Sequence, residues 1–350
     1  MKKSLIALAV LAASGAAMAQ SSVTVYGRLD AGVGSSKIGA PGVASNTQLF
    51  SNQLTTSRLG FRGTEDLGGG MSAIFGLETG LNPDAPGATT LGDRAAFVGL
   101  SSGFGTIKLG RHDTSFDDIR DLMVSSNLWD SPFYTSIETV LGTGGNATNG
   151  VSGLADYGDR ASNQIRYESP SFSGFTFGVS HAFDENSATS RDVTAFNVRY
   201  KAGNLDVGVA FQENSQQSAA PVSPATTITT NAIDYTTVAG AYNFGSFRVS
   251  GGWNQAKQTE VASPIKANTY TIGVNVPVNA LDFSVGYSTA KSKQAGATLQ
   301  KGSAFSAGVT YSLSKRTRLY ALLTNGDIEN AAGTKLRQRD QYAVGVAHTF

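Results

Sequence analysis

Apolar and polar residues alternate along most of the chain with a period of two. Near the C-terminal end, Tyr342, Val344 and Val346 fall on one face of an extended segment, with Ala343 and Gly345 on the other. Successive side chains of a β-strand point to opposite faces of a sheet, so this pattern predicts strands with one apolar face. A strand buried on both sides would be apolar throughout, and we therefore expect strands that contact water on one side.

Counting the alternating segments gives sixteen predicted strands, an even number. Most are close to the ~9 to 11 residues with which a tilted strand crosses a bilayer. A closed barrel of this width is not filled by its own side chains and leaves an aqueous channel. The predicted strands are residues 22–34, 57–67, 70–80, 93–102, 104–111, 160–169, 174–184, 193–202, 204–214, 232–244, 246–257, 267–277, 280–292, 302–313, 316–325 and 339–350.

The connections between these segments alternate between short and long. Short turns include Gly68–Gly70 and Gly245–Ser246, and long polar loops are predicted at residues 34–56, 212–232 and 325–338. Short periplasmic turns and long extracellular loops are typical of outer-membrane barrels. The alternative is a soluble β-sandwich, which also alternates with period two but shows its polar face to solvent.

The N-terminal residues indicate export and favour the membrane barrel. Lys2 and Lys3 precede an apolar run, and small residues lead to Ala19, a pattern typical of a secretory signal peptide cleaved before Gln20. The alternative, a retained membrane helix, would need ~20 apolar residues. We therefore expect a signal peptide at residues 1–19 and a membrane-spanning β-barrel at residues 20–350, located in the outer membrane.

Composition limits the other functions that the chain could have. Without residues 1–19 the chain has 25 basic and 26 acidic residues, a balance that gives no reason to expect nucleic-acid binding. There are no cysteines and only three histidines, His112, His181 and His348, so no metal-ligand spacing is recognisable. No cofactor and no metal are expected. An outer-membrane hydrolase remains an alternative, but no histidine has a recognisable nucleophile partner.

One long segment, residues 112–159, lacks the alternation. Its first half carries four aspartates among apolar residues, which makes it too apolar for a solvated linker. Inside a wide barrel such a loop could pack on the wall and narrow the passage, so we expect a constriction loop folded into the lumen. An external loop used in surface contacts is the alternative. The aspartates are Asp113, Asp117, Asp118 and Asp121.

Several arginines are expected to face the lumen. Arg58 and Arg62 lie opposite Leu59 and Phe61 in the alternation, and Arg160 shares the parity of Arg166. Arginines that face loop carboxylates across a narrow pore would act as a selectivity filter, because rings of arginine favour anions. Each arginine could instead pair locally with Glu78 or Asp30.

A further arginine, Arg94, opens its predicted strand. Its assignment to the lumen follows if Ala95 and Phe97 face lipid, although Val98 and Leu100 would then share the parity of Arg94.

The motifs resemble those of the trimeric general porins of Gram-negative bacteria, in the beta-proteobacterial branch. The resemblance spans the chain from Gln20 onward and is carried by the segments Thr56–Gly70 (TSRLGFRGTEDLGGG), Asp93–Leu100 (DRAAFVGL), Phe104–Arg111 (FGTIKLGR) and the terminal Phe350. It implies a 16-stranded antiparallel transmembrane β-barrel, a homotrimer and a long third extracellular loop folded into the lumen.

The same resemblance assigns roles to particular residues. It implies that Arg58, Arg94 and Arg160 line the constriction, and that Phe350 is an assembly signal read by the outer-membrane assembly machinery. The function expected is a general diffusion channel for ions and small hydrophilic solutes, weakly anion-selective. A sugar-specific channel is the alternative, because Tyr26 and Tyr320 have lumen parity.

Overall fold

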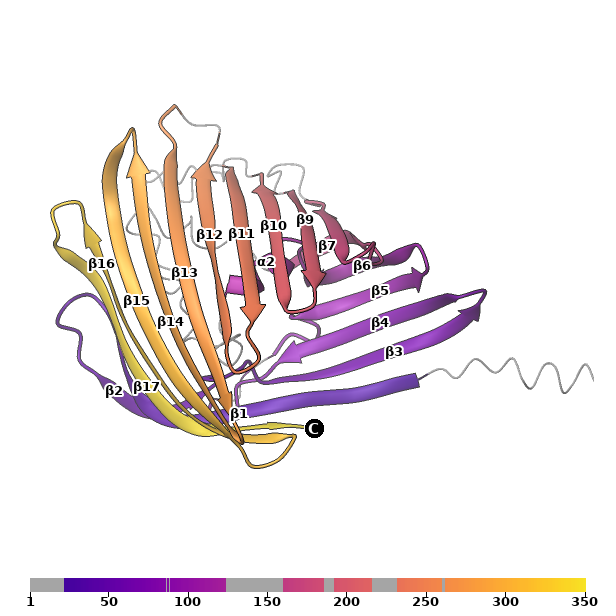
Figure 1. The fold of residues 1–350 in the computed structure, drawn as a ribbon, viewed down its shortest axis with the longest axis horizontal. Coiled ribbons are helices and arrows are strands. Elements are labelled where there is room, and N and C mark those ends of the chain that lie inside the picture. The colour runs from indigo at the N-terminus through magenta and orange to yellow at the C-terminus, as the bar shows by residue number, and fades with distance from the viewer. Residues whose placement is uncertain are drawn as a thin grey trace, which may run out of the picture.

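The computed structural model describes residues 22–85, 87, 89–123, 160–185, 192–215, 232–259 and 262–350. The expected signal peptide at residues 1–19 and most of the expected loop at residues 112–159 lie outside the described residues. Within them the chain is a wide, tilted β-barrel (Figure 1). No helix in this part of the chain is long and apolar enough to cross a membrane.

The strands agree closely with the alternating segments of the sequence. They are β1 (Ser22–Gly39), β2 (Asn46–Ser51), β3 (Arg58–Gly68), β4 (Met71–Gly80), β5 (Ala95–Ser102), β6 (Gly105–Asp113), β7 (Arg160–Glu168), β8 (Phe175–Ala182), β9 (Val193–Ala202), β10 (Leu205–Asn214), β11 (Ile233–Asn243), β12 (Arg248–Gln258), β13 (Ile265–Val278), β14 (Leu281–Gln294), β15 (Ala297–Ser312), β16 (Thr317–Asn330) and β17 (Lys335–Thr349). Two short helical turns follow β6, α2 (Asp117–Arg120) and η1 (Asp121–Met123).

The sheet is antiparallel and closes on itself. β1 pairs with β17 from Arg28 to Gly39, which joins the first and last strands. Along its other edge β1 pairs with β2 at residues 31–36 and with β3 at residues 22–28. β2 and β3 therefore share one position in the ring, and the seventeen strand elements make the predicted sixteen-stranded barrel. Among the strands that the structure describes, closure leaves no unpaired edge in the hydrocarbon.

The two faces of each strand differ as the alternation predicts. On β17, Tyr342 and Val344 are 60% and 52% exposed, whereas Ala343 between them is 1% exposed. The exposed set consists of large apolar side chains and forms the outer face of the barrel. The inner face carries small and polar residues.

Two of the three long loops predicted from the sequence are wrong, because the structure has strands in these segments. The loop expected at residues 34–56 contains the end of β1 and all of β2, and the loop expected at residues 325–338 is mostly strand. These strands extend past the length needed to cross the bilayer, where both faces contact water. Alternation is absent there, and the pattern cannot distinguish a protruding hairpin from a loop.

Candidate pore constriction

A glutamate on β4 holds two wall arginines together inside the barrel. Arg94 Nε lies 2.7 Å from Glu78 Oε1, and Arg58 Nη1 lies 3.4 Å from the same oxygen. The Tyr26 hydroxyl donates to Glu78 Oε2 at 3.0 Å. All three charged side chains are largely buried, and the two guanidinium groups share one oxygen of this carboxylate.

Two more arginines extend this basic stretch of wall. The guanidinium carbon of Arg62 lies 5.1 Å from the centre of the Tyr26 ring, a cation–π contact. Arg28 Nη1 donates to Thr55 Oγ1 at 2.6 Å. The prediction that Arg58 and Arg62 share the face opposite Phe61 agrees with these contacts.

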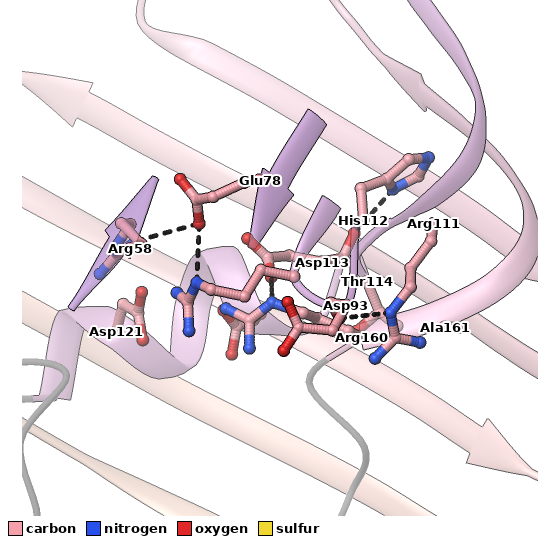
Figure 2. A network of polar contacts seen from close by, with 12 residues as sticks. Arg58, Glu78, Asp93, Arg111, His112, Asp113, Thr114, Asp121, Arg160 and Ala161 are labelled. Atoms are coloured by element: carbon pink, nitrogen blue, oxygen red, sulfur yellow. Dashed lines mark hydrogen bonds and ion pairs between the residues drawn. The ribbon is translucent and has the colours of Figure 1, made fainter. Parts of the chain in front are cut away.

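The four aspartates at the start of the long loop are each in contact with an arginine. Asp113 Oδ1 lies 2.8 Å from Arg160 Nε, and Asp118 Oδ2 lies 2.6 Å from Arg166 Nη2. The other two, Asp117 and Asp121, flank Arg120 of α2, with Arg120 Nε 3.2 Å from Asp121 Oδ1. Figure 2 shows the wall pair of Arg58 and Glu78 in the same view as the pair of Arg160 and Asp113.

Apolar side chains hold the start of the loop against the inner wall. The α2 and η1 turns contact β9 to β13. The Phe116 ring meets the buried Tyr235 ring edge-on, with centroids 6.2 Å apart. A Cβ added to Gly208 would collide with Ile119 Cδ1, and one added to Gly252 would collide with Met123 Cγ. The wall thus provides small residues where the loop packs, and residues 114–123 lie inside the barrel.

The alternation of inner and outer faces predicted from the sequence does not extend along β7 to Arg160. The register between β6 and β7 shifts between Gly110 and His112, and Asn163 has a positive φ of 54°. A bulge of this kind inserts one extra residue and reverses the alternation beyond it. Arg160 meets the loop because it pairs directly with Asp113 across the two strands.

The predicted faces of the strand after Arg94 are wrong. Val98 and Leu100 are the exposed residues of β5, while Phe97 lies inside, with His112 edge-on at 5.8 Å and Lys108 Nζ 5.4 Å from its centroid. β5 begins at Ala95, so Arg94 precedes the strand and is not governed by its parity.

Several contacts in this region were not predicted from the sequence. Arg166 also lies 3.0 Å from Glu168, and Asn197 Nδ2 donates to Asp118 Oδ2 at 2.9 Å. Arg120 was not recognised as a partner of the loop aspartates. Alternation identifies the face of a side chain but not its partner, whether that partner lies two residues away, as for Arg166 and Glu168, or 79 residues away, as for Asn197 and Asp118. Within the described ranges, no group of three or more histidines and carboxylates is placed to hold a metal ion.

A closed barrel with an apolar outer face, a polar inner face and charged side chains gathered inside is a membrane-spanning pore. The chain belongs to the Gram-negative porin family, which it matches over residues 5–331. It is therefore an outer-membrane porin, a channel for the passive diffusion of ions and small hydrophilic solutes.

Relatives with established names agree with this assignment. Outer membrane porin protein 32 of Delftia acidovorans is 37% identical over 355 residues, which cover 99% of this chain and 95% of the relative. An outer membrane porin protein of Bordetella pertussis is 29% identical, with full coverage of both chains.

Solved structures share the fold. The anion-selective porin from Comamonas acidovorans superposes with a TM-score of 0.77 at 27% identity, covering 95% of this chain and 100% of that one. The trimer form of OmpT from Vibrio cholerae has a TM-score of 0.69 at 16% identity, covering 94% and 99%.

Proposed function

We propose that this porin is weakly anion-selective and that its constriction is formed by wall arginines and the start of the long loop. On the wall side, the selectivity residues are Arg58, Arg62 and Arg94. On the loop side they are Asp113, Asp117, Asp118 and Asp121, together with Arg160. The observation that carries the proposal is the gathering of Arg58, Arg62 and Arg94 on one stretch of wall around Glu78 and Tyr26.

The sign of the selectivity depends on how many carboxylates act on passing ions. Asp113 and Asp118 each pair with one arginine, which cancels most of their field at a distance. Arg28 and Arg62 add positive charge beside the wall cluster. Basic side chains at a narrow passage favour anions. The structural similarity to an anion-selective porin supports the same sign.

Reversal potentials in a KCl gradient test this proposal. The purified protein in a planar bilayer should favour chloride over potassium, and the double variant Arg58→Gln/Arg94→Gln should lose that preference. Arg316→Gln, which changes an exposed residue of the turn between β15 and β16, is the control for loss of positive charge. A cation preference in the unmodified protein, or an equal effect of the control, would overturn the assignment.

The solute class follows from the lumen tyrosines. Tyr26 and Tyr320, which could have formed a track for a sugar, donate their hydroxyls to Glu78 and Asp30. This favours a general diffusion pore over a sugar-specific channel. Conductance measured with candidate sugars present as blockers distinguishes the two, and a sugar that blocks at low concentration would favour the specific channel.

We also propose that the protein is a homotrimer and carries no catalytic activity. Light scattering of the detergent-solubilised protein tests the first statement, since a monomer mass would contradict it. A hydrolase screen tests the second. The ring nitrogen Nδ1 of each histidine contacts a polar side chain: His112 contacts Gln164, His181 contacts Thr194 and His348 contacts Thr317.

The two ends of the chain are proposed to direct export and assembly. A signal peptide at residues 1–19 predicts a mature protein that starts at Gln20, which intact mass spectrometry can check. Phe350 is proposed as the assembly signal. Its backbone exchanges two hydrogen bonds with Gly27, at 3.0 and 3.1 Å, and these bonds fix the last residue beside β1. Phe350→Ala should lower the yield of folded barrel in the membrane without abolishing folding in detergent.

A further inference from the structure

A groove of about 630 Å³ opens on the outer face of the barrel over β9 to β12. Its walls are apolar side chains that point away from the lumen, and Val209 and Val238 among them are exposed. Figure 1 shows these four strands side by side. The volume lies within the ~300 to 1,000 Å³ typical of ligand pockets. We call this surface the glycine groove; it consists of Val207, Val209, Val238, Gly240, Gly251 and Trp253.

Two glycines form the floor of the groove. Gly240 of β11 and Gly251 of β12 lie opposite each other in the ladder, with Val207 opposite Gly240 on β10 and Ile272 opposite Gly251 on β13. Along these described strands the ladders have no bulge, and neither glycine has a positive φ. Glycine inside a regular strand weakens it and often marks a place where a ligand approaches closely.

No aromatic ring of the barrel covers this floor. Elsewhere on the outer face the Phe75 ring covers Gly63, since a Cβ added to that glycine would lie 2.2 Å from Phe75 Cε1. The atoms nearest to a Cβ added at Gly240 or Gly251 belong to no ring, and at Gly251 they are all backbone atoms of β13. Close approach of the strands thus keeps side chains off the floor, which is open to the molecules that surround the barrel.

The groove lies in the periplasmic half of the membrane. Gly240 is three residues before the end of β11, and Gly251 is three residues after the start of β12. Three residues of strand advance by about 10 Å, and by less along the membrane normal because the strands are tilted. The short turn between these strands carries Phe244 and Phe247, whose rings stack with centroids 4.7 Å apart. Aromatic girdles mark the boundary between hydrocarbon and headgroups, so the floor lies among the acyl chains of the periplasmic leaflet.

The width of the floor selects the kind of molecule that fits. The two glycines lie on neighbouring strands, which are ~4.8 Å apart, whereas an α-helix with its side chains is about 10 Å across. One extended chain of carbon atoms, with contacts of ~3.5 to 4 Å on each side, fits this floor, and a helix of a partner protein does not. Trp253 lines the upper end, and its Nε1 donates to Asn268 Oδ1 at 3.0 Å, which holds the ring in place.

Two tyrosines stand where the groove meets the headgroup boundary. Tyr200 lines the groove on β9, and Tyr242 follows Gly240 by two residues on β11, toward the periplasmic turn. Within the part of the chain that the structure describes, neither hydroxyl makes a hydrogen bond. A tyrosine hydroxyl can donate to an ester or phosphate oxygen. The groove thus offers hydrogen-bond donors at its periplasmic end and apolar atoms at its centre.

We infer that the glycine groove binds one acyl chain of a phospholipid from the periplasmic leaflet. The ester and phosphate oxygens lie beside Tyr200 and Tyr242, and the chain runs over Gly240 and Gly251 toward Trp253. Because the surrounding lipid tails are as apolar as the groove, retention depends on close packing and on the two hydroxyls. The bound lipid is independent of ion selectivity, since the groove lies on the outside of the barrel.

Quenching of Trp253 fluorescence by a brominated lipid tests this inference. The full-length porin in detergent micelles carries Trp129→Phe throughout, which leaves Trp253 as the only tryptophan. The probe is a phosphatidylglycerol with bromine at mid-chain carbons, added at a low ratio to detergent. A lipid held in the groove quenches along a saturable curve, whereas lipid that exchanges freely around the barrel quenches in proportion to its fraction in the micelle.

Val207→Phe fills the groove from its wall. Val207 faces Gly240 in the ladder as Phe75 faces Gly63, so this barrel already accommodates a ring in the same arrangement. Val285→Phe adds the same ring at an exposed position of β14 outside the groove and is the control. The control should bind the probe as the unmodified groove does, and Val207→Phe at least about tenfold more weakly, because an occupied site must be overpacked to take the chain.

Tyr200→Phe/Tyr242→Phe removes both hydroxyl donors and retains the rings. Neutral hydrogen bonds contribute modestly, so binding should weaken by about threefold to tenfold. Tyr311→Phe, at an exposed position of β15 on the outer face, is the control and should leave binding unchanged. Native mass spectrometry should show that Val207→Phe retains one phospholipid fewer per barrel than Val285→Phe does.

Three results would overturn the inference. Quenching proportional to the lipid fraction, with the same slope in Val207→Phe, would mean ordinary boundary lipid only. Saturable binding that Val207→Phe leaves unchanged would place the lipid outside the groove. A particle mass in light scattering that falls in Val207→Phe but not in Val285→Phe would identify a second copy of the chain as the occupant.

Discussion

The Tyr320 hydroxyl donates a 2.6 Å hydrogen bond to Asp30 Oδ1 across the closing seam of the barrel. Tyr320 lies on β16 and Asp30 on β1, with β17 between them, and a Cβ on Gly345 of β17 would collide with the tyrosine oxygen. Glycine is required there because the ring crosses that strand. The second oxygen of Asp30 accepts from the backbone N–H groups of Leu54 and Thr55 at 2.6 and 2.7 Å. One buried carboxylate thus joins β16, β1 and the segment between β2 and β3.

Tyr320→Phe should destabilise the barrel. Removing the hydroxyl takes one donor from a fully buried carboxylate, a loss of about 1.5 to 3 kcal/mol for a hydrogen bond to a charged group. The measurement is the urea midpoint of unfolding in detergent. Tyr311→Phe on the neighbouring strand, whose ring is exposed on the outer face, is the control and should leave the midpoint unchanged. Equal shifts in the two variants would mean that the bond to Asp30 is not important for stability.

The sequence predicted the barrel strands well, for a physical reason. A strand with lipid on one side and water on the other must alternate, and all sixteen predicted strands have a counterpart in the structure. β2 was missed because it lies in a protruding hairpin, where this requirement does not apply. The contact between Asp30 and Tyr320 could not be predicted, since parity places both inside without stating which strands the ring crosses.

Glu78→Gln should strengthen the anion preference. The substitution removes the carboxylate that Arg58 and Arg94 share while retaining an oxygen that can accept from Tyr26. A partly screened unit charge at the constriction should change the anion-to-cation permeability ratio by about twofold, or ~0.4 kcal/mol. Reversal potentials in a KCl gradient measure the ratio.

Glu65→Gln is the matched control for that experiment, because Glu65 is exposed on β3. It removes the same charge from the protein without touching the wall cluster. An unchanged ratio in Glu78→Gln, or an equal change in the control, would contradict the role given to the cluster.

Ile119→Ala/Met123→Ala should release the start of the loop from the wall. Both side chains are buried against β10 and β12, and each truncation of a buried apolar side chain costs about 2 to 5 kcal/mol. The loss falls on the loop contact rather than on the strand ladder. We therefore expect single-channel conductance and open-channel noise to rise while the unfolding midpoint of the barrel stays the same.

Leu323→Ala on the outer face is the control for the loop variant, and it should leave the conductance unchanged. If the loop variant also kept the conductance of the unmodified protein, this segment would not narrow the pore.

The candidate site could be predicted only in part. Alternation placed Arg58 and Arg62 inside correctly, because β3 is regular where they lie. It failed around Arg160, where the bulge at Asn163 interrupts the register, and at Phe97, whose strand begins after Arg94. The bulge on β7 reverses parity and leaves no trace in a pattern of apolar and polar residues, whereas on β5 the apolar Val98 and Leu100 already indicated the opposite faces.

The anion preference should weaken as the salt concentration rises. Charges in a water-filled lumen are screened over a Debye length of about 10 Å at 0.1 M salt and about 3 Å at 1 M. The wall arginines act on passing ions through water, so their field at the pore axis falls with this length. The anion-to-cation permeability ratio, measured at a fixed KCl gradient around mean concentrations of ~0.1 M and ~1 M, should move toward one at the higher value. A ratio independent of salt would show that selectivity comes from direct contact of ions with the arginines rather than from their field.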